Sequence, residues 1–117
     1  MADYLYLFRG GNETRGKSSP EAMQEHMMKW KIWMDKLAAQ GKLMSGLPLQ
    51  DEGKVISGSA KQLLDGPYME GKEMVGGYLI VSADTLDEAA EMSKECPIFE
   101  HEGSVEIREL ASMTMHD

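Results

Sequence analysis

The chain has 117 residues, the size of one domain, and carries a net charge of −8 from 12 basic and 20 acidic residues. Hydrophobic residues make up 42% of it and charged residues 27%, as in ordinary globular proteins. The acidic balance argues against direct binding to nucleic acid or to an anionic membrane, because both partners need a basic surface.

Cysteine usage and the N-terminus point to the compartment. The single cysteine, Cys96, excludes an intrachain disulfide. No apolar stretch is long enough to span a membrane, and the N-terminus lacks the basic and apolar segments of a signal peptide. We therefore expect a cytoplasmic protein with one domain over residues 1–117, in which residues 111–117 form a frayed tail.

The first predicted element is a strand over residues 3–9. Tyr4, Tyr6 and Phe8 alternate with two leucines, so both faces of this strand are apolar and both are expected to be covered. A polar, glycine-containing loop follows over residues 10–18.

A long helix is predicted after this loop. Ser19 is placed to cap it and Pro20 to occupy its first position. The helix should run to about Gln40 and stop at Gly41. Its predicted apolar stripe has helical spacing and comprises Met23, Met27, Trp30, Met34 and Leu37.

The middle of the chain is predicted to form strands. Residues 43–49 form one, and residues 54–57 form a short strand that residues 60–64 continue. A further strand runs over about 73–81. The glycine pair at 76–77 indicates a β-bulge or a close approach of backbone or ligand.

The last elements are a helix over about 85–95, with Thr85 in a capping box, and an alternating strand over 104–110. The order of elements is the βαββαβ plan of the ferredoxin-like fold, an α+β class with two helices on one face of an antiparallel sheet. The other face needs a cover, and the aromatic side of the first strand makes a bare face costly. A second copy of the chain is the simplest cover, which predicts a homodimer.

His26 is the first candidate for chemistry, because it lies on the predicted apolar stripe four residues before Trp30. A histidine partly withdrawn from water beside a tryptophan can act as an acid or a base. It can equally be a core histidine bonded to a backbone carbonyl. The spacing leaves both alternatives open.

The second candidate is the loop DGPYMEGKE over residues 65–73. Asp65 can close a tight turn through its own backbone, or it can orient a histidine. Lys72 and Glu73 fit a solvated hairpin face as well as a binding site. Both interpretations of the loop stay open.

Other site chemistries have weak signals. The three histidines are widely spaced, so no metal site is predicted. Cys96 follows a helix, whereas thiolates are favoured at helix N-termini. Residues 8–11, FRGG, lack the ending of a phosphate loop, although Arg9 can bind a small anion. No cofactor is predicted.

The loop motif resembles the YCII-related family, in its DGPF-domain branch. That branch is named for an Asp-Gly-Pro-Phe run followed by Glu-x-Lys-Glu, and here Tyr68 replaces the phenylalanine. Further matches are FRGG at 8–11, SPE at 19–21, and CP at 96–97 leading to GSVEIR at 103–108. The resemblance covers about residues 4–110.

This resemblance implies a ferredoxin-like protomer that forms a dimeric α+β barrel, similar in architecture to muconolactone isomerases and to small monooxygenases lacking metals. The broader family has a histidine in its first helix, where His26 falls, and an aspartate as its suggested catalytic partner. Cys96-Pro97-Ile98 stands where that aspartate is expected, and Asp65 is a candidate substitute. DGPF proteins also occur beside or fused to extracytoplasmic-function sigma factors, which implies a sigma-factor partner.

Three functions fit these features. The first is a metal-free, isomerase-like or lyase-like acid–base enzyme on a small polar molecule, with His26 and Asp65 as its catalytic residues. The second is a ligand-binding or regulatory module linked to a sigma factor, and the third is a dimer without catalysis. The predicted substrate contacts are Tyr6, Arg9, Trp30, Tyr68, Lys72 and Glu73.

Overall fold

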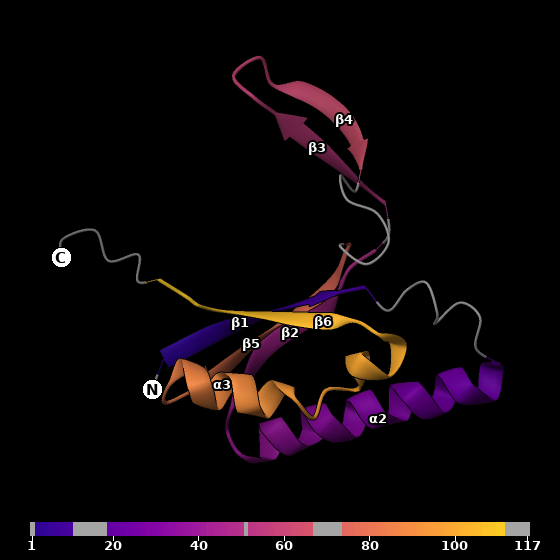
Figure 1. Ribbon diagram of the computed structural model, residues 1–117, viewed down its shortest axis with the longest axis vertical. Coiled ribbons are helices and arrows are strands. Elements are labelled where there is room, and N and C mark those ends of the chain that lie inside the picture. The colour runs from indigo at the N-terminus through magenta and orange to yellow at the C-terminus, as the bar shows by residue number, and fades with distance from the viewer. Residues whose placement is uncertain (1, 11–18, 51, 67–73, 112–117) are drawn as a thin grey trace.

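The computed structural model describes residues 2–10, 19–50, 52–66 and 74–111, and of residues 64–66 the backbone alone. Figure 1 shows how the elements are arranged. In chain order they are β1 (Ala2–Arg9), α2 (Pro20–Ala39), β2 (Leu43–Pro48), β3 (Gly53–Ser57), β4 (Gln62–Gly66), β5 (Val75–Ala83), α3 (Leu86–Ser93), the 3-10 helix η2 (Pro97–His101) and β6 (Ser104–Glu109).

The main sheet has four antiparallel strands in the order β2-β5-β1-β6. Both helices lie on one side of this sheet (Figure 1). The strands β3 and β4 form a separate hairpin that stands off the sheet on the other side (Figure 1). The predicted ferredoxin-like α+β fold is therefore confirmed, with the hairpin inserted between the second and third strands of the sheet.

The predicted helix caps are present. The Ser19 hydroxyl accepts a hydrogen bond from the backbone N–H of Ala22 at 3.1 Å, and Pro20 occupies the first turn of α2. The Thr85 hydroxyl accepts from the backbone N–H of Glu88 at 3.1 Å and caps α3. Each cap satisfies a backbone donor that has no partner inside its helix.

The apolar stripe of α2 differs from the prediction. The buried residues of the helix are His26, Trp33 and Leu37, whereas Met27 is 55% exposed. Trp33 is buried because the aromatic side chains of β1 reach it; its ring stacks on that of Tyr6 at 6.2 Å. The helix is thus rotated toward its aromatic residues, which bury more apolar area than a methionine does.

The prediction that residues 60–64 continue the strand of 54–57 is wrong. The chain reverses between the two segments, and β4 pairs antiparallel with β3, with Ile56 opposite Leu63. Gly58 and Lys61 adopt positive φ angles of 74° and 55°, and the Lys61 N–H donates to the Gly58 carbonyl at 3.0 Å. The tight turn depends on the conformational freedom of Gly58.

The predicted bulge at the glycine pair is confirmed. Phe8 pairs with Gly77 but Arg9 pairs with Val75, so Gly76 is an extra residue in β5. Gly46 of β2 is a glycine because the two strands approach closely there. A Cβ on Gly46 would lie 2.3 Å from Leu79 Cδ2 of β5. A side chain at this position of the edge strand β2 would therefore collide with β5, its neighbour in the sheet.

The two sides of β1 have different surroundings. Tyr4, Tyr6 and Phe8 are buried under the helices. The expectation that this aromatic side needs an outside cover is therefore wrong, because the helix layer already covers it. The open face of the sheet carries half-buried aliphatic residues, and Leu5 and Leu7 are the two that β1 contributes.

Candidate functional site

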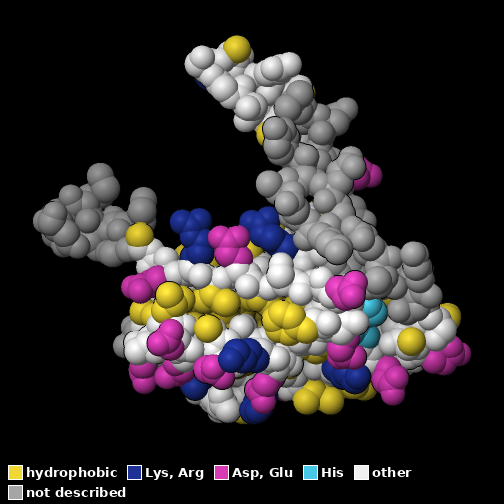
Figure 2. Space-filling view, in the orientation of Figure 1, with side chains coloured by type: hydrophobic (Ala, Val, Ile, Leu, Met, Phe, Trp, Pro, Cys, Tyr) yellow, Lys and Arg dark blue, Asp and Glu magenta, His cyan; other side chains and the backbone are white. Residues whose placement is uncertain are grey.

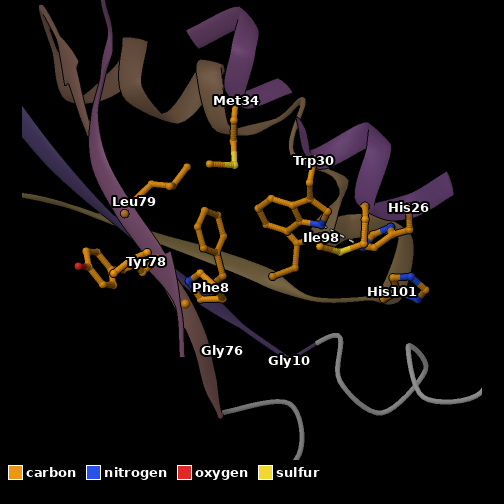
Figure 3. Close-up of a pocket in the computed structure, with 15 residues that line it drawn as sticks. Phe8, Gly10, His26, Trp30, Met34, Gly76, Tyr78, Leu79, Ile98 and His101 are labelled. Carbon is orange, nitrogen blue, oxygen red and sulfur yellow. Dashed lines mark hydrogen bonds between the residues drawn. The ribbon is translucent and has the colours of Figure 1, made fainter. Parts of the chain in front are cut away.

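A cavity of about 190 Å³ lies between the sheet and the helix layer (Figure 3). Its aromatic walls are Phe8 of β1 and Trp30 of α2, whose rings meet edge to face with centroids 5.1 Å apart. Met34 of α2, Leu79 of β5 and Ile98 of η2 add aliphatic surface. The cavity has the mostly apolar lining with few polar groups that is typical of small-molecule sites.

Glycine backbone forms one end of the cavity. Gly10 follows β1, and Gly76 and Gly77 form the bulge of β5. The Gly10 N–H donates to the carbonyl of Met74 at 3.1 Å, which holds these two chain segments together. The bulge therefore lines this end of the cavity with main chain and no side chain.

Two imidazoles line the cavity. His26 of α2 and His101 of η2 have ring centroids 4.3 Å apart and planes at 78° (Figure 3). His26 is 6% exposed, whereas His101 is half-buried. The pair thus combines one ring removed from water with one that water reaches, and histidine surface is visible in Figure 2.

Trp30 makes a specific hydrogen bond to His26. The indole Nε1–H donates to His26 Nε2 at 3.0 Å, one helical turn apart on α2 (Figure 3). An indole nitrogen can only donate, so Nε2 of His26 is the acceptor. The bond fixes the orientation of the His26 ring at the cavity wall.

The position of His101 follows from how η2 is held. Gly103, just after η2, packs so tightly that a Cβ on it would lie 2.4 Å from Ile98 Cγ1 and 2.9 Å from the Arg9 carbonyl oxygen. On the other side, Lys29 Nζ of α2 and Glu100 Oε1 of η2 form an ion pair at 2.9 Å. These contacts fix η2 between β1 and α2, and they bring His101 beside His26.

The Lys29–Glu100 pair also sets the charge next to the imidazoles. The hydrogen bond from Lys29 lowers the pKa of the Glu100 carboxyl below its ordinary value, and His26 and His101 lower it further. Glu100 is therefore a carboxylate at neutral pH.

The predicted site residues lie in different places. Trp30 lines the cavity. Tyr6 does not; it is fully buried in the core, and its hydroxyl donates to the Ala89 carbonyl. Arg9 forms an ion pair with Glu106 at 3.0 Å on the open face of the sheet. Of the predicted contacts that the structure describes, Trp30 alone is brought to His26.

The loop candidates stay predictions. Asp65 belongs to β4, where its backbone pairs with Lys54, and its side chain is outside the described part of the structure. Tyr68, Lys72 and Glu73 lie outside the described residues.

Sequence reasoning missed His101 as a partner of His26. The two residues are far apart in the chain, and no short motif joins them. The available signal was the segment Cys96-Pro97-Ile98, at the expected place of the family aspartate, because it begins the short helix η2 that ends at His101. Within the described residues, no three metal-ligating side chains come together, and no helix is long and apolar enough to cross a membrane.

Fold and cavity together define a small α+β protein with a ligand-sized site between sheet and helices. The YCII-related domain matches residues 11–114, so the chain belongs to the YCII-related family. The resemblance predicted from the sequence is thereby confirmed. A comparison with curated proteins gives no match.

A solved structure has the same architecture. It is the 5-chloro-2-hydroxyhydroquinone dehydrochlorinase TftG from Burkholderia phenoliruptrix AC1100, in complex with 2,5-dihydroxybenzoquinone. The two chains superpose with a TM-score of 0.55 over 93% of each, at 14% sequence identity. At this identity the likeness establishes a shared fold.

Proposed function

We propose that the protein binds a small planar organic molecule with polar substituents in this cavity and acts on it by acid–base catalysis. The observation that carries the proposal is the His26–His101 pair, with ring centroids 4.3 Å apart in an otherwise mainly apolar cavity. Imidazole is the side chain that most readily exchanges protons near neutral pH. Two of them beside an aromatic wall combine proton exchange with a binding surface.

The size and shape of the cavity favour one ring. An apolar cavity of about 150 Å³ is enough to bind benzene, and this cavity measures about 190 Å³. Phe8 and Trp30 offer ring faces and edges against which a flat molecule can pack. The glycine backbone and the imidazoles offer hydrogen bonds to its substituents.

The structural neighbour supports the same class of ligand. TftG is named for its action on a chlorinated hydroxyhydroquinone, and its structure contains 2,5-dihydroxybenzoquinone. A single ring with oxygen substituents has the dimensions and polarity that suit the cavity described above. The compound is therefore the first probe for binding.

Binding is tested by calorimetric titration of the full chain with 2,5-dihydroxybenzoquinone. Figure 3 shows the Met34 side chain directed into the cavity, so Met34→Phe should obstruct it and raise the Kd at least tenfold. Met28→Phe is the matched control, because Met28 is 54% exposed and does not line the cavity. Equal affinities of the two variants, or no heat of binding with the wild type, would contradict the proposal.

Catalysis is tested separately, by exchange of the ring protons of the same compound for deuterium, followed by proton NMR. The wild type should accelerate the exchange. A variant with both His26→Asn and His101→Asn should lose roughly a hundredfold or more of that acceleration, as removal of a general acid–base group does. Exchange at the wild-type rate in the double variant would exclude the imidazole pair as the catalytic group.

We also propose that the open face of the sheet pairs with a second copy of the chain. Leu5 is opposite Ile80 and Leu7 is opposite Tyr78, so these side chains form one apolar strip. The hairpin β3–β4 stands off on this side and exposes Ile56, which is 68% exposed (Figure 1). Pairing would cover both surfaces.

A further inference from the structure

The hairpin of β3 and β4 has little support from its own chain. Its two strands form a sheet of their own, and among the described residues they pair with no strand of the main sheet. In that part of the chain the hairpin has at most marginal contact with any other helix or strand, and it stands off the main sheet (Figure 1). A two-stranded hairpin is only marginally stable in water unless a further element packs against it. The described protomer does not supply that packing.

One side of the hairpin carries an exposed apolar pair. Ile56 and Leu63 are directly opposite each other in the register, so their side chains lie next to each other on the same side. Ile56 is 68% exposed and Leu63 is 56% exposed. The next pair toward the turn, Ser57 and Gln62, is polar and points to the other side. The hairpin therefore holds two large apolar side chains together in water.

The hairpin shares its side of the molecule with the open face of the main sheet. That face carries the apolar strip of Leu5, Leu7, Ile80 and Tyr78. The strip extends to the edge strand, because Leu47 of β2 is opposite Tyr78 and is 65% exposed. Two uncovered apolar surfaces, the strip and the Ile56–Leu63 pair, thus belong to elements on the same side of the protomer (Figure 1).

The length of the hairpin determines how it would meet a body seated on the open face. Each of its strands has five residues, which span about 17 Å at about 3.4 Å per residue. Two packed sheets lie only about 10 Å apart. Because the hairpin stands off the sheet and is longer than this spacing, it would extend past the sheet of a second copy and flank that copy. Two-fold symmetry would give the second copy the same contact in return.

We infer that the hairpin β3–β4 is an arm that packs, through Ile56 and Leu63, against the side of a second copy of this chain. The inference deepens the proposed pairing of open faces and rests on it. Each chain contributes one arm, so the strip and two hairpins hold the dimer together. A second copy fits both surfaces at once, because it covers the strip and also supplies the packing that the hairpin lacks.

The first test is sedimentation equilibrium of the full chain carrying Ile56→Asp together with Leu63→Asp. Both side chains are exposed in the protomer, so the variant should fold, whereas burial of two carboxylates against the partner is costly. The dissociation constant of the dimer should rise roughly tenfold or more. The matched control is Ser57→Asp together with Gln62→Asp, which adds the same charge to the neighbouring pair on the other side of the hairpin. It should change the constant by no more than about twofold.

The outcomes separate this inference from the proposals on which it rests. A dimeric wild type, with equal dissociation constants for the two double variants, would overturn the arm and leave the pairing of open faces standing. A monomeric wild type would refute both the pairing and the arm. Neither result bears on the cavity, because binding of 2,5-dihydroxybenzoquinone is measured independently.

Hydrogen exchange of the wild type gives a second test that needs no variant. Backbone amides of β3 and β4 should exchange slowly well above the dissociation constant of the dimer. Well below it they should exchange roughly tenfold faster or more, because the free protomer offers the hairpin little packing. Amides of β1, which lies between β5 and β6 in the main sheet, should exchange slowly at both concentrations. Equally fast exchange of the hairpin at both concentrations would overturn the inference.

Discussion

The two faces of the main sheet differ sharply, although the same strands build both. On the covered face, Tyr6 of β1 is fully buried and Phe8 is 5% exposed. On the open face, Leu5 and Leu7 of the same strand remain half-buried. Because successive side chains of a strand point to opposite faces of the sheet, neighbouring residues of β1 face either the helix layer or the open surface.

The difference separates two tasks. The covered face holds the core and the cavity, so aromatic residues on this side both stabilise the fold and line the cavity. The open face carries the apolar strip of Leu5, Leu7, Ile80 and Tyr78, bordered by the Arg9–Glu106 ion pair. We expect substitutions on the covered face to act on the free energy of unfolding, and those on the open face to act on association.

The largest expected effect is on the covered face. Tyr6→Ala removes a fully buried ring that stacks on Trp33 and bonds to the Ala89 carbonyl, and it should lower the free energy of unfolding by about 3–5 kcal/mol. Leu5→Ala should cost about 1 kcal/mol, because that side chain is only partly withdrawn from water. Urea denaturation at one protein concentration measures both, and equal losses would remove the distinction between the faces.

The next effect concerns association through the open face. Leu7→Asp places a charge in the apolar strip. It should raise the dissociation constant of the proposed dimer about a hundredfold, which weakens the free energy of association by roughly 2.7 kcal/mol. Met28→Asp, on the exposed side of α2, should leave it unchanged. Sedimentation equilibrium gives both constants. A monomeric wild type at micromolar concentration would refute the dimer.

The smallest expected effect is a pH dependence of the free energy of unfolding, which comes from a buried thiol on the covered side. Burial raises the pKa of the Cys96 thiol from 9.0 to about 12. Above pH 9 the unfolded chain loses this proton while the folded chain keeps it, so the stabilisation is complete below about pH 9 and declines as the pH rises toward 12. Between pH 9 and 10 the loss should be roughly 1 kcal/mol.

Cys96→Ala isolates this contribution. Burial raises the pKa of Tyr6 as well, so part of the decline should persist in the variant. Urea denaturation at pH 8, 9 and 10 should give a shallower decline for the variant than for the wild type. Parallel curves would show that the thiol is not protected by the fold.

Local signals in the sequence predicted much of the fold. Ser19 and Thr85 cap the two helices as expected, because a hydroxyl just before a helix has a backbone donor within reach. The glycine pair at 76–77 marks the bulge. The order of elements indicated the ferredoxin-like plan, and the motif at 65–73 indicated the family.

The remaining features depend on contacts between distant segments. The rotation of α2 is set by ring contacts between Trp33 and β1, which helical spacing alone does not reveal. Tyr6 is a core residue because the helix layer covers its side of β1, whereas alternation left the choice of side open. His101 meets His26 through the packing of η2 on α2. The sigma-factor partner and the cytoplasmic location stay predictions.

The placement of the two tryptophans gives the cavity its own optical reporter. Trp30 lines the cavity, while Trp33 is buried against Tyr6 and does not line it. These are the only fluorophores of this kind in the chain. A molecule that enters the cavity contacts Trp30 directly, so a change in the intrinsic tryptophan emission would report its entry without any label.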